Sequence, residues 1–146
     1  MRIVLFACAE SAAVDQTTQR LSIFHVLEEI FASVFPTAYP QLTMIVMASR
    51  EQTEPSTFNL NLRITLSGHE QPLMDGGFQL EFQNRPHAHT LARIAGLPIP
   101  SPGVLHFSLS YEERELSAWD VFVTQVPHPT ITTQPAGPGR PPQPAA

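Results

Sequence analysis

The chain has 146 residues, 42% of them hydrophobic and only 14% charged, so it is long enough for one domain with a sizeable core. Its formal net charge is −5, and its eight basic residues, all arginine, form no cluster, which argues against nucleic acid as a partner. No apolar run approaches the roughly 20 residues that span a bilayer, so no membrane partner is expected. The single cysteine excludes an intramolecular disulfide and favours a reducing compartment.

The first predicted strand begins almost at the N-terminus, in the sequence MRIVLFACAES. Leu5 to Cys8 have the spacing of a bacterial lipoprotein cleavage site, but an export signal needs an apolar region of roughly 7–15 residues. The apolar run before Cys8 is only Ile3 to Ala7, which is typical of a buried strand bounded by polar residues. We therefore expect Cys8 to be a packed thiol and the protein to remain in the cytoplasm.

Two further apolar runs follow. Leu21–Ile30 is predicted to be a second strand that forms a hairpin with the first across a polar loop. The apolar spacing then becomes helical between Leu27 and Val34, which allows one or two helical turns ended by Pro36. The sequence QLTMIVMAS, residues 41–49, is another predicted strand.

The clearest strand signal is FNLNLRITLSG, residues 58–68, where apolar and polar side chains alternate strictly. This alternation is typical of an antiparallel sheet with one buried and one solvated face. Residues 77–83 repeat this alternation. Residues 89–97 are predicted to form a strand on a weaker pattern, and residues 103–126 are predicted to form a closing hairpin. The residues predicted to face inward in that hairpin are Leu105, Phe107, Leu109, Tyr111, Trp119, Val121 and Val123.

About eight short strands separated by turns predict an all-β, antiparallel two-sheet sandwich over residues 1–126, with at most one short helix. Residues 127–146 contain seven of the fifteen prolines and almost no large apolar side chains, which predicts a disordered tail. Two proline pairs there, Pro138/Pro141 and Pro141/Pro144, have PxxP spacing. Such a tail either serves as a ligand for an aromatic groove or only aids solubility.

His87 and His89 are the candidate metal ligands. On a strand, residues two apart point to the same face, roughly 6.5–7 Å apart along the chain, so two imidazoles can share one metal ion. A third ligand would come from His106, Glu81 or Asp75, none of which has a diagnostic spacing. The alternative is two exposed histidines on a solvated face.

Other candidate groups favour structural roles. Cys8 with His25 as base could form a nucleophilic pair, but catalytic cysteines lie in electropositive positions and Cys8 lies in an apolar strand. Trp119 shares the parity of two valines, which indicates a place in the core or an interface. Four carboxylates could approach one another across the first hairpin, although a solvated edge is favoured: Glu10, Asp15, Glu28 and Glu29.

Most of residues 1–126 resembles a small bacterial family of unknown function. Its members have an apolar strand ending in Cys-Glu, then a strand L-S-I-F-x-V-[IL]-[DE]-x-I and a proline. The matching residues here are Cys8, Glu10, Leu21–Phe24, Val26, Leu27, Glu28, Ile30 and Pro36, and, in a later pattern, Gly103, Leu105, Phe107 and Leu109. One residue separates Cys8 from Glu10, a small departure. The resemblance implies a β-sandwich, usually cytoplasmic, with no assigned catalytic residues.

The sequence contains no motif that identifies a reaction: GxSxG, Walker A, GxGxxG and HExxH are all absent. Many short apolar strands with low charge predict a non-catalytic protein without a cofactor that binds a protein partner or itself, as a homo-oligomer. The alternative is a metal-binding protein or metal-dependent enzyme that uses His87 and His89. A module for small ligands or carbohydrates is a third hypothesis.

Overall fold

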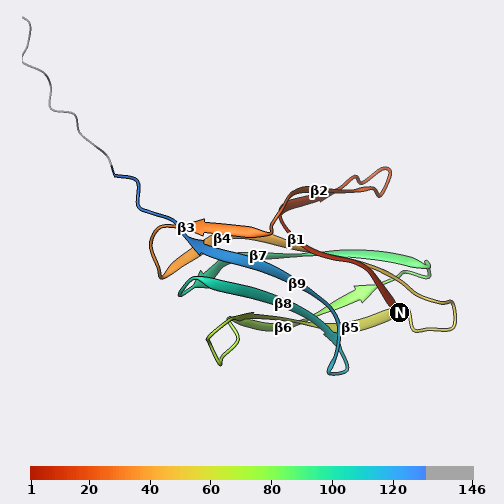
Figure 1. Ribbon diagram of the computed structural model, residues 1–146. Helices are drawn as coiled ribbons and strands as arrows, with labels where there is room; N and C mark the ends of the chain where they lie inside the picture. The colour runs from red at the N-terminus through yellow and green to blue at the C-terminus, as the bar shows by residue number, and fades with distance from the viewer. Residues whose placement is uncertain (131–146) are drawn as a thin grey trace, which may run out of the picture.

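Residues 1–130 are described by the computed structural model, and they form nine strands and no helix (Figure 1). Sheet A has the strand order β2-β1-β4-β7, and sheet B has the order β3-β9-β8-β5-β6. Figure 1 shows the two sheets as stacked layers. The strands are β1 Arg2–Val14, β2 Leu21–Val26, β3 Glu29–Ala32, β4 Thr37–Ser49, β5 Thr57–Leu66, β6 Met74–Glu81, β7 His87–Ile99, β8 Gly103–Tyr111 and β9 Arg114–Gln125.

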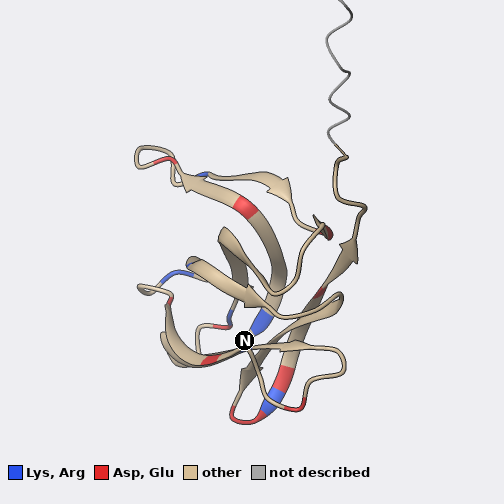
Figure 2. Ribbon diagram, turned by 90° about the vertical axis from the view of Figure 1, so that its left-hand side faces the viewer, with Lys and Arg blue, Asp and Glu red and all other residues tan. Residues whose placement is uncertain are grey.

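The predicted all-β, two-sheet fold is confirmed, with one strand more than the roughly eight expected. Every neighbouring pair of strands is antiparallel except β3 and β9, which run parallel, with Ile30 opposite Val123. No helix in the described part of the chain is long and apolar enough to cross a membrane. Charged residues of both signs are distributed over the strands and turns (Figure 2).

The helical turns predicted between Leu27 and Pro36 are wrong, because Glu29–Ala32 form strand β3. The backbone of this segment bonds to distant strands. The Leu27 N–H donates to the Cys8 carbonyl at 2.8 Å, and the Glu28 carbonyl accepts from the Phe122 N–H at 2.9 Å. A strand stabilised by such long-range bonds overrides the local apolar spacing that suggested a helix.

The main core lies between the two sheets. The alternation predicted for β5 is confirmed, since every second side chain is buried: Phe58, Leu60, Leu62, Ile64 and Leu66. The same holds for Leu105, Phe107 and Leu109 of β8, which are fully buried against sheet A. The sequence pattern therefore identified the inner face of sheet B correctly.

A second apolar cluster lies on the other face of sheet A. Strand β1 pairs with β4 only as far as Ala9, and beyond that point it pairs with β2 alone. Residues 10–26, here called the arm, fold back over the outer face of sheet A (Figure 1). Leu21 and Ile23 of the arm pack there against a buried cluster formed by Ala9, Ala12 and Ile45. Because of the arm, strand β4 has buried side chains on both faces: Ile45 on the outer face and Met44 on the inner face.

The predicted tail begins at residue 127, and residues 127–130 form no strand. Both PxxP pairs lie outside the described residues, as does the rest of the segment predicted to be disordered.

Candidate functional site

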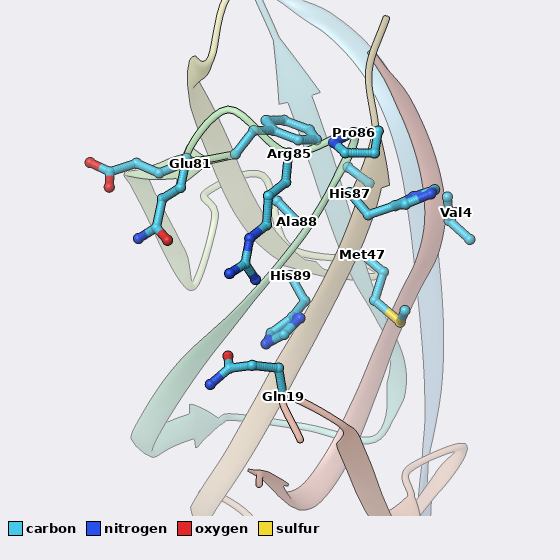
Figure 3. A pocket seen from close by; sticks show the side chains of 12 residues that line it. Val4, Gln19, Met47, Glu81, Arg85, Pro86, His87, Ala88 and His89 are labelled. Carbon is cyan, nitrogen blue, oxygen red and sulfur yellow. The ribbon is translucent and has the colours of Figure 1, made fainter. Parts of the chain in front are cut away.

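A cavity of about 460 Å³ opens on the outer face of sheet A, where β7 begins (Figure 3). It is here called the β7 pocket. Its volume is within the roughly 300–1,000 Å³ typical of small-molecule sites. The lining residues used below come from β1, the β1–β2 loop, β4, β6, the β6–β7 turn and β7: Val4, Gln19, Met47, Glu81, Arg85, His87 and His89.

Strand register places the floor of the β7 pocket. His89 lies opposite Met47 of β4, and His87 lies two residues earlier on the same face of β7. The pairing of β1 with β4 shifts between Ile3 and Leu5, so Val4 has no partner on β4. Val4 is half exposed and lines the pocket beside Met47. A local bulge therefore adds an apolar side chain to this surface.

The wall of the β7 pocket is the β6–β7 turn, which Arg50 holds in place. The Arg50 backbone N–H donates to the Pro86 carbonyl at 2.9 Å, and its Nε–H donates to the Arg85 carbonyl at 3.2 Å. The guanidinium also lies 5.5 Å from the centroid of the Phe82 ring. These contacts fix the backbone that carries Arg85 and leave the Arg85 guanidinium directed into the pocket (Figure 3).

The arm closes the side of the β7 pocket opposite this turn. Gln19 has a left-handed backbone with φ of 58°, and its N–H donates to the Asp15 carbonyl at 2.8 Å. The Asp15 carboxylate accepts the N–H groups of Thr18 and Thr17, both at 2.8 Å. These backbone hydrogen bonds lower the pKa of Asp15, because they favour its charged form. The loop is thus a defined turn that sets the place of Gln19.

The structure places His87 and His89 on one face of β7, as the strand spacing predicted, and both line the β7 pocket, but their rings point apart. In Figure 3 the His87 ring points toward Val4, and the His89 ring points toward Gln19. Of the proposed third ligands, only Glu81 lines the pocket, and its carboxylate points away from both rings. No group of three His, Cys, Asp or Glu side chains within residues 1–130 is placed to hold a metal ion. A metal bound by the histidine pair alone stays a prediction.

The other two proposed ligands lie elsewhere and have partners there. His106 is on sheet B, and its Nδ1 lies 2.6 Å from an Asp120 carboxylate oxygen. Asp75 accepts hydrogen bonds from Asn61 at 2.8 Å and Arg63 at 3.0 Å, which lower the pKa of Asp75. Neither residue lines the β7 pocket.

A family model for a family of unknown function, DUF6941, matches residues 4–124. The chain belongs to this family. No curated protein matches the chain. The matched range includes all the residues of the β7 pocket named above, so the pocket is part of the family domain and not an appendage of this DUF6941 chain.

Cys8 and His25 of this DUF6941 chain do not form a nucleophilic pair. Cys8 is fully buried, and this burial raises the pKa of its thiol to about 12, so the thiol is protonated at neutral pH. The His25 ring is exposed, and its Nδ1 lies 2.8 Å from the Glu10 carboxylate. Cys8 thus acts as a small apolar side chain of the core.

The remaining candidates of the DUF6941 chain have structural contacts. Glu10 faces His25, while Asp15 caps the arm turn, so these carboxylates of the first hairpin serve different contacts. Trp119 packs against the main core, and its indole N–H donates to the Leu27 carbonyl at 2.8 Å. This bond links β9 to the connection between β2 and β3, and of the two predicted places, core or interface, the packing of Trp119 agrees with the core.

Exposed apolar side chains form a second surface of interest. Among residues 1–130, six large apolar side chains are exposed, and only Val4 lies outside β2, β3, the loop after β3 and β9. The other five are here called the β2–β3 surface: Phe24, Val26, Phe31, Val34 and Phe122. Phe122 could have been found from the sequence, because it alternates with two inward valines. Phe31 could not, since its strand was predicted to be helical.

Proposed function

We propose that this chain is a non-catalytic interaction module that binds a second copy of itself through the β2–β3 surface. The supporting observation is the exposure of five large apolar side chains. Four of them lie within residues 24–34, and the fifth, Phe122, lies on β9, which pairs with β3. Large contiguous patches of exposed apolar side chains are uncommon on monomeric proteins, and those that occur often mark interaction sites. We also propose the cytoplasm as its compartment, supported by the buried, unpaired thiol of Cys8.

The register of β3 and β9 brings two of these side chains to one face. Ile30 and Val123 lie opposite each other and point into the core, so Phe31 and Phe122 both point outward from sheet B. They are 61% and 53% exposed. Because β3 is the end strand of sheet B, its other side has no strand partner in the described chain. A second copy could cover the phenylalanines and this edge together.

We expect Phe31→Ser to raise the dissociation constant for self-association by roughly 10- to 100-fold, since burying one phenylalanine contributes about 1.5–3 kcal/mol. Val34→Ser should weaken association less, and Val4→Ser should leave it unchanged. The two valines are a matched pair, 56% and 52% exposed, and only Val34 belongs to the β2–β3 surface. Light scattering across a concentration series measures all three variants.

Two results would contradict this proposal. One is a wild-type chain that remains monomeric over the whole concentration series. The other is an equal effect of Val34→Ser and Val4→Ser, which would place the contact outside the β2–β3 surface.

Metal binding by His87 and His89 is the second candidate function, favoured by the fact that both imidazoles line the β7 pocket. We expect protein purified without an affinity tag to carry stoichiometric metal that is lost from a His87→Ala/His89→Ala variant. His69→Ala is the control, because His69 is exposed and lies outside the pocket. Elemental analysis without stoichiometric metal, or with metal retained after both substitutions, would exclude this function.

A further inference from the structure

The β7 pocket presents positively charged and donor groups without a facing carboxylate. In Figure 3 the Arg85 guanidinium, on the wall of the cavity, points toward the His89 ring, on its floor. Arg85 has no ion pair within residues 1–130. Glu81 is the only carboxylate that lines the pocket, and its side chain points away from Arg85. Although the whole chain has a net charge of −5, the β7 pocket is therefore locally positive and should attract a negatively charged group.

Beside Arg85, this arrangement suits an oxyanion better than the metal cation of the second candidate function. A bound divalent ion would be repelled by the positive charge of the Arg85 guanidinium. An oxyanion would instead accept hydrogen bonds from the guanidinium fork and from the His89 imidazole N–H. The divergence of the two histidine rings is no obstacle here, because only His89 needs to face Arg85 (Figure 3).

The rest of the lining indicates an apolar portion in the ligand. Val4 and Met47 form an apolar floor next to the histidines. The cavity of about 460 Å³ is larger than a lone phosphate or carboxylate group requires. Gln19 flanks His89 from the arm, and its amide nitrogen donates to the Gln16 carbonyl at 3.0 Å, which steadies the side chain.

From these contacts we propose that the β7 pocket binds a small organic oxyanion, a carboxylate or a phosphate monoester, whose apolar part lies on Val4 and Met47. Arg85 binds the oxyanion, His89 donates a second hydrogen bond, and Arg50 positions the turn that carries Arg85. This site is independent of self-association, because no residue of the β2–β3 surface lines the pocket.

The test is a titration of the ¹⁵N-labelled full chain with phenyl phosphate, benzoate and phenol, followed by NMR. Phenyl phosphate, benzoate or both should shift the amide signals of Arg85, His87 and His89 saturably, and phenol should not. The tighter of the two anions identifies the headgroup. Inorganic phosphate should bind more weakly than phenyl phosphate, because it lacks the apolar part.

Two matched variants test the role of Arg85. Arg85→Gln should raise the dissociation constant by about 10- to 100-fold, the usual effect of losing a charge-assisted hydrogen bond. Arg93→Gln removes an exposed arginine from the outer face of β7, outside the pocket, and should leave anion binding unchanged. Both positions are exposed, so both variants should fold.

The proposal is wrong if neither anion gives a saturable shift, or if the shifted signals map away from the β7 pocket. It is equally wrong if phenol binds as tightly as the anions, or if Arg85→Gln and Arg93→Gln have the same effect. Shifts of the His87 and His89 signals by Zn²⁺ alone, with no anion binding, would assign the pocket to the metal function instead.

Discussion

Phe107→Ala should lower the free energy of unfolding by about 3–5 kcal/mol. Phe107 is fully buried in β8, between Ile64 of β5 and Trp119 of β9. Removing its ring leaves a cavity at the centre of sheet B's inner face, which the flanking strands cannot fill without losing their register. Urea denaturation followed by tryptophan fluorescence measures the change.

Phe122→Ala is the matched control for this prediction. Phe122 lies on the adjacent strand β9 but points outward and is about half exposed. We expect it to change the stability of the monomer by less than about 1 kcal/mol, as is usual for surface substitutions. The comparison is made at low protein concentration, so that self-association does not contribute. Equal losses for Phe107 and Phe122 would mean that the inner and outer faces of sheet B are assigned wrongly.

Ile45→Ala should lower the free energy of unfolding by about 2–5 kcal/mol, although Ile45 points away from the main core. Ile45 is fully buried in the second apolar cluster, on the outer face of sheet A, and Leu21 and Ile23 of the arm pack against this cluster. Its truncation therefore weakens the contact that holds the arm. We expect limited proteolysis under native conditions to cut the arm loop, residues 15–20, faster in the variant than in the wild type.

Leu42→Ala separates loss of the arm contact from general destabilisation. Leu42 lies on the same strand and is equally buried, but it faces the main core. Its truncation should cost a similar free energy without selectively speeding cleavage of the arm loop. If both variants are cut in the arm at the same rate, the arm is not held by Ile45, and the second apolar cluster does not stabilise it.

The candidate site could be predicted from the sequence only in part. The period of two along a strand was enough to place His87 and His89 on one face, and both line the β7 pocket. It could not show that the rings diverge, because side-chain rotamers depend on neighbours such as Val4 and Met47. The long separation in sequence between Gln19 and His89 left no local pattern that joins them.

Alternation alone determined the inner face of sheet B, because a strand with one solvated side must place apolar residues at every second position. The sequence likewise determined the all-β class, since few segments have helical spacing and none could serve as a crossover. Tertiary structure decided what local pattern cannot encode. Glu29–Ala32 became a strand through parallel pairing with β9, and the arm buried Ile45 by folding back. Arg85 faces His89 because Arg50, from another part of the chain, holds the turn that carries Arg85. Each of these outcomes depends on contacts between residues far apart in the chain, which form only when the two sheets and their connections are in place.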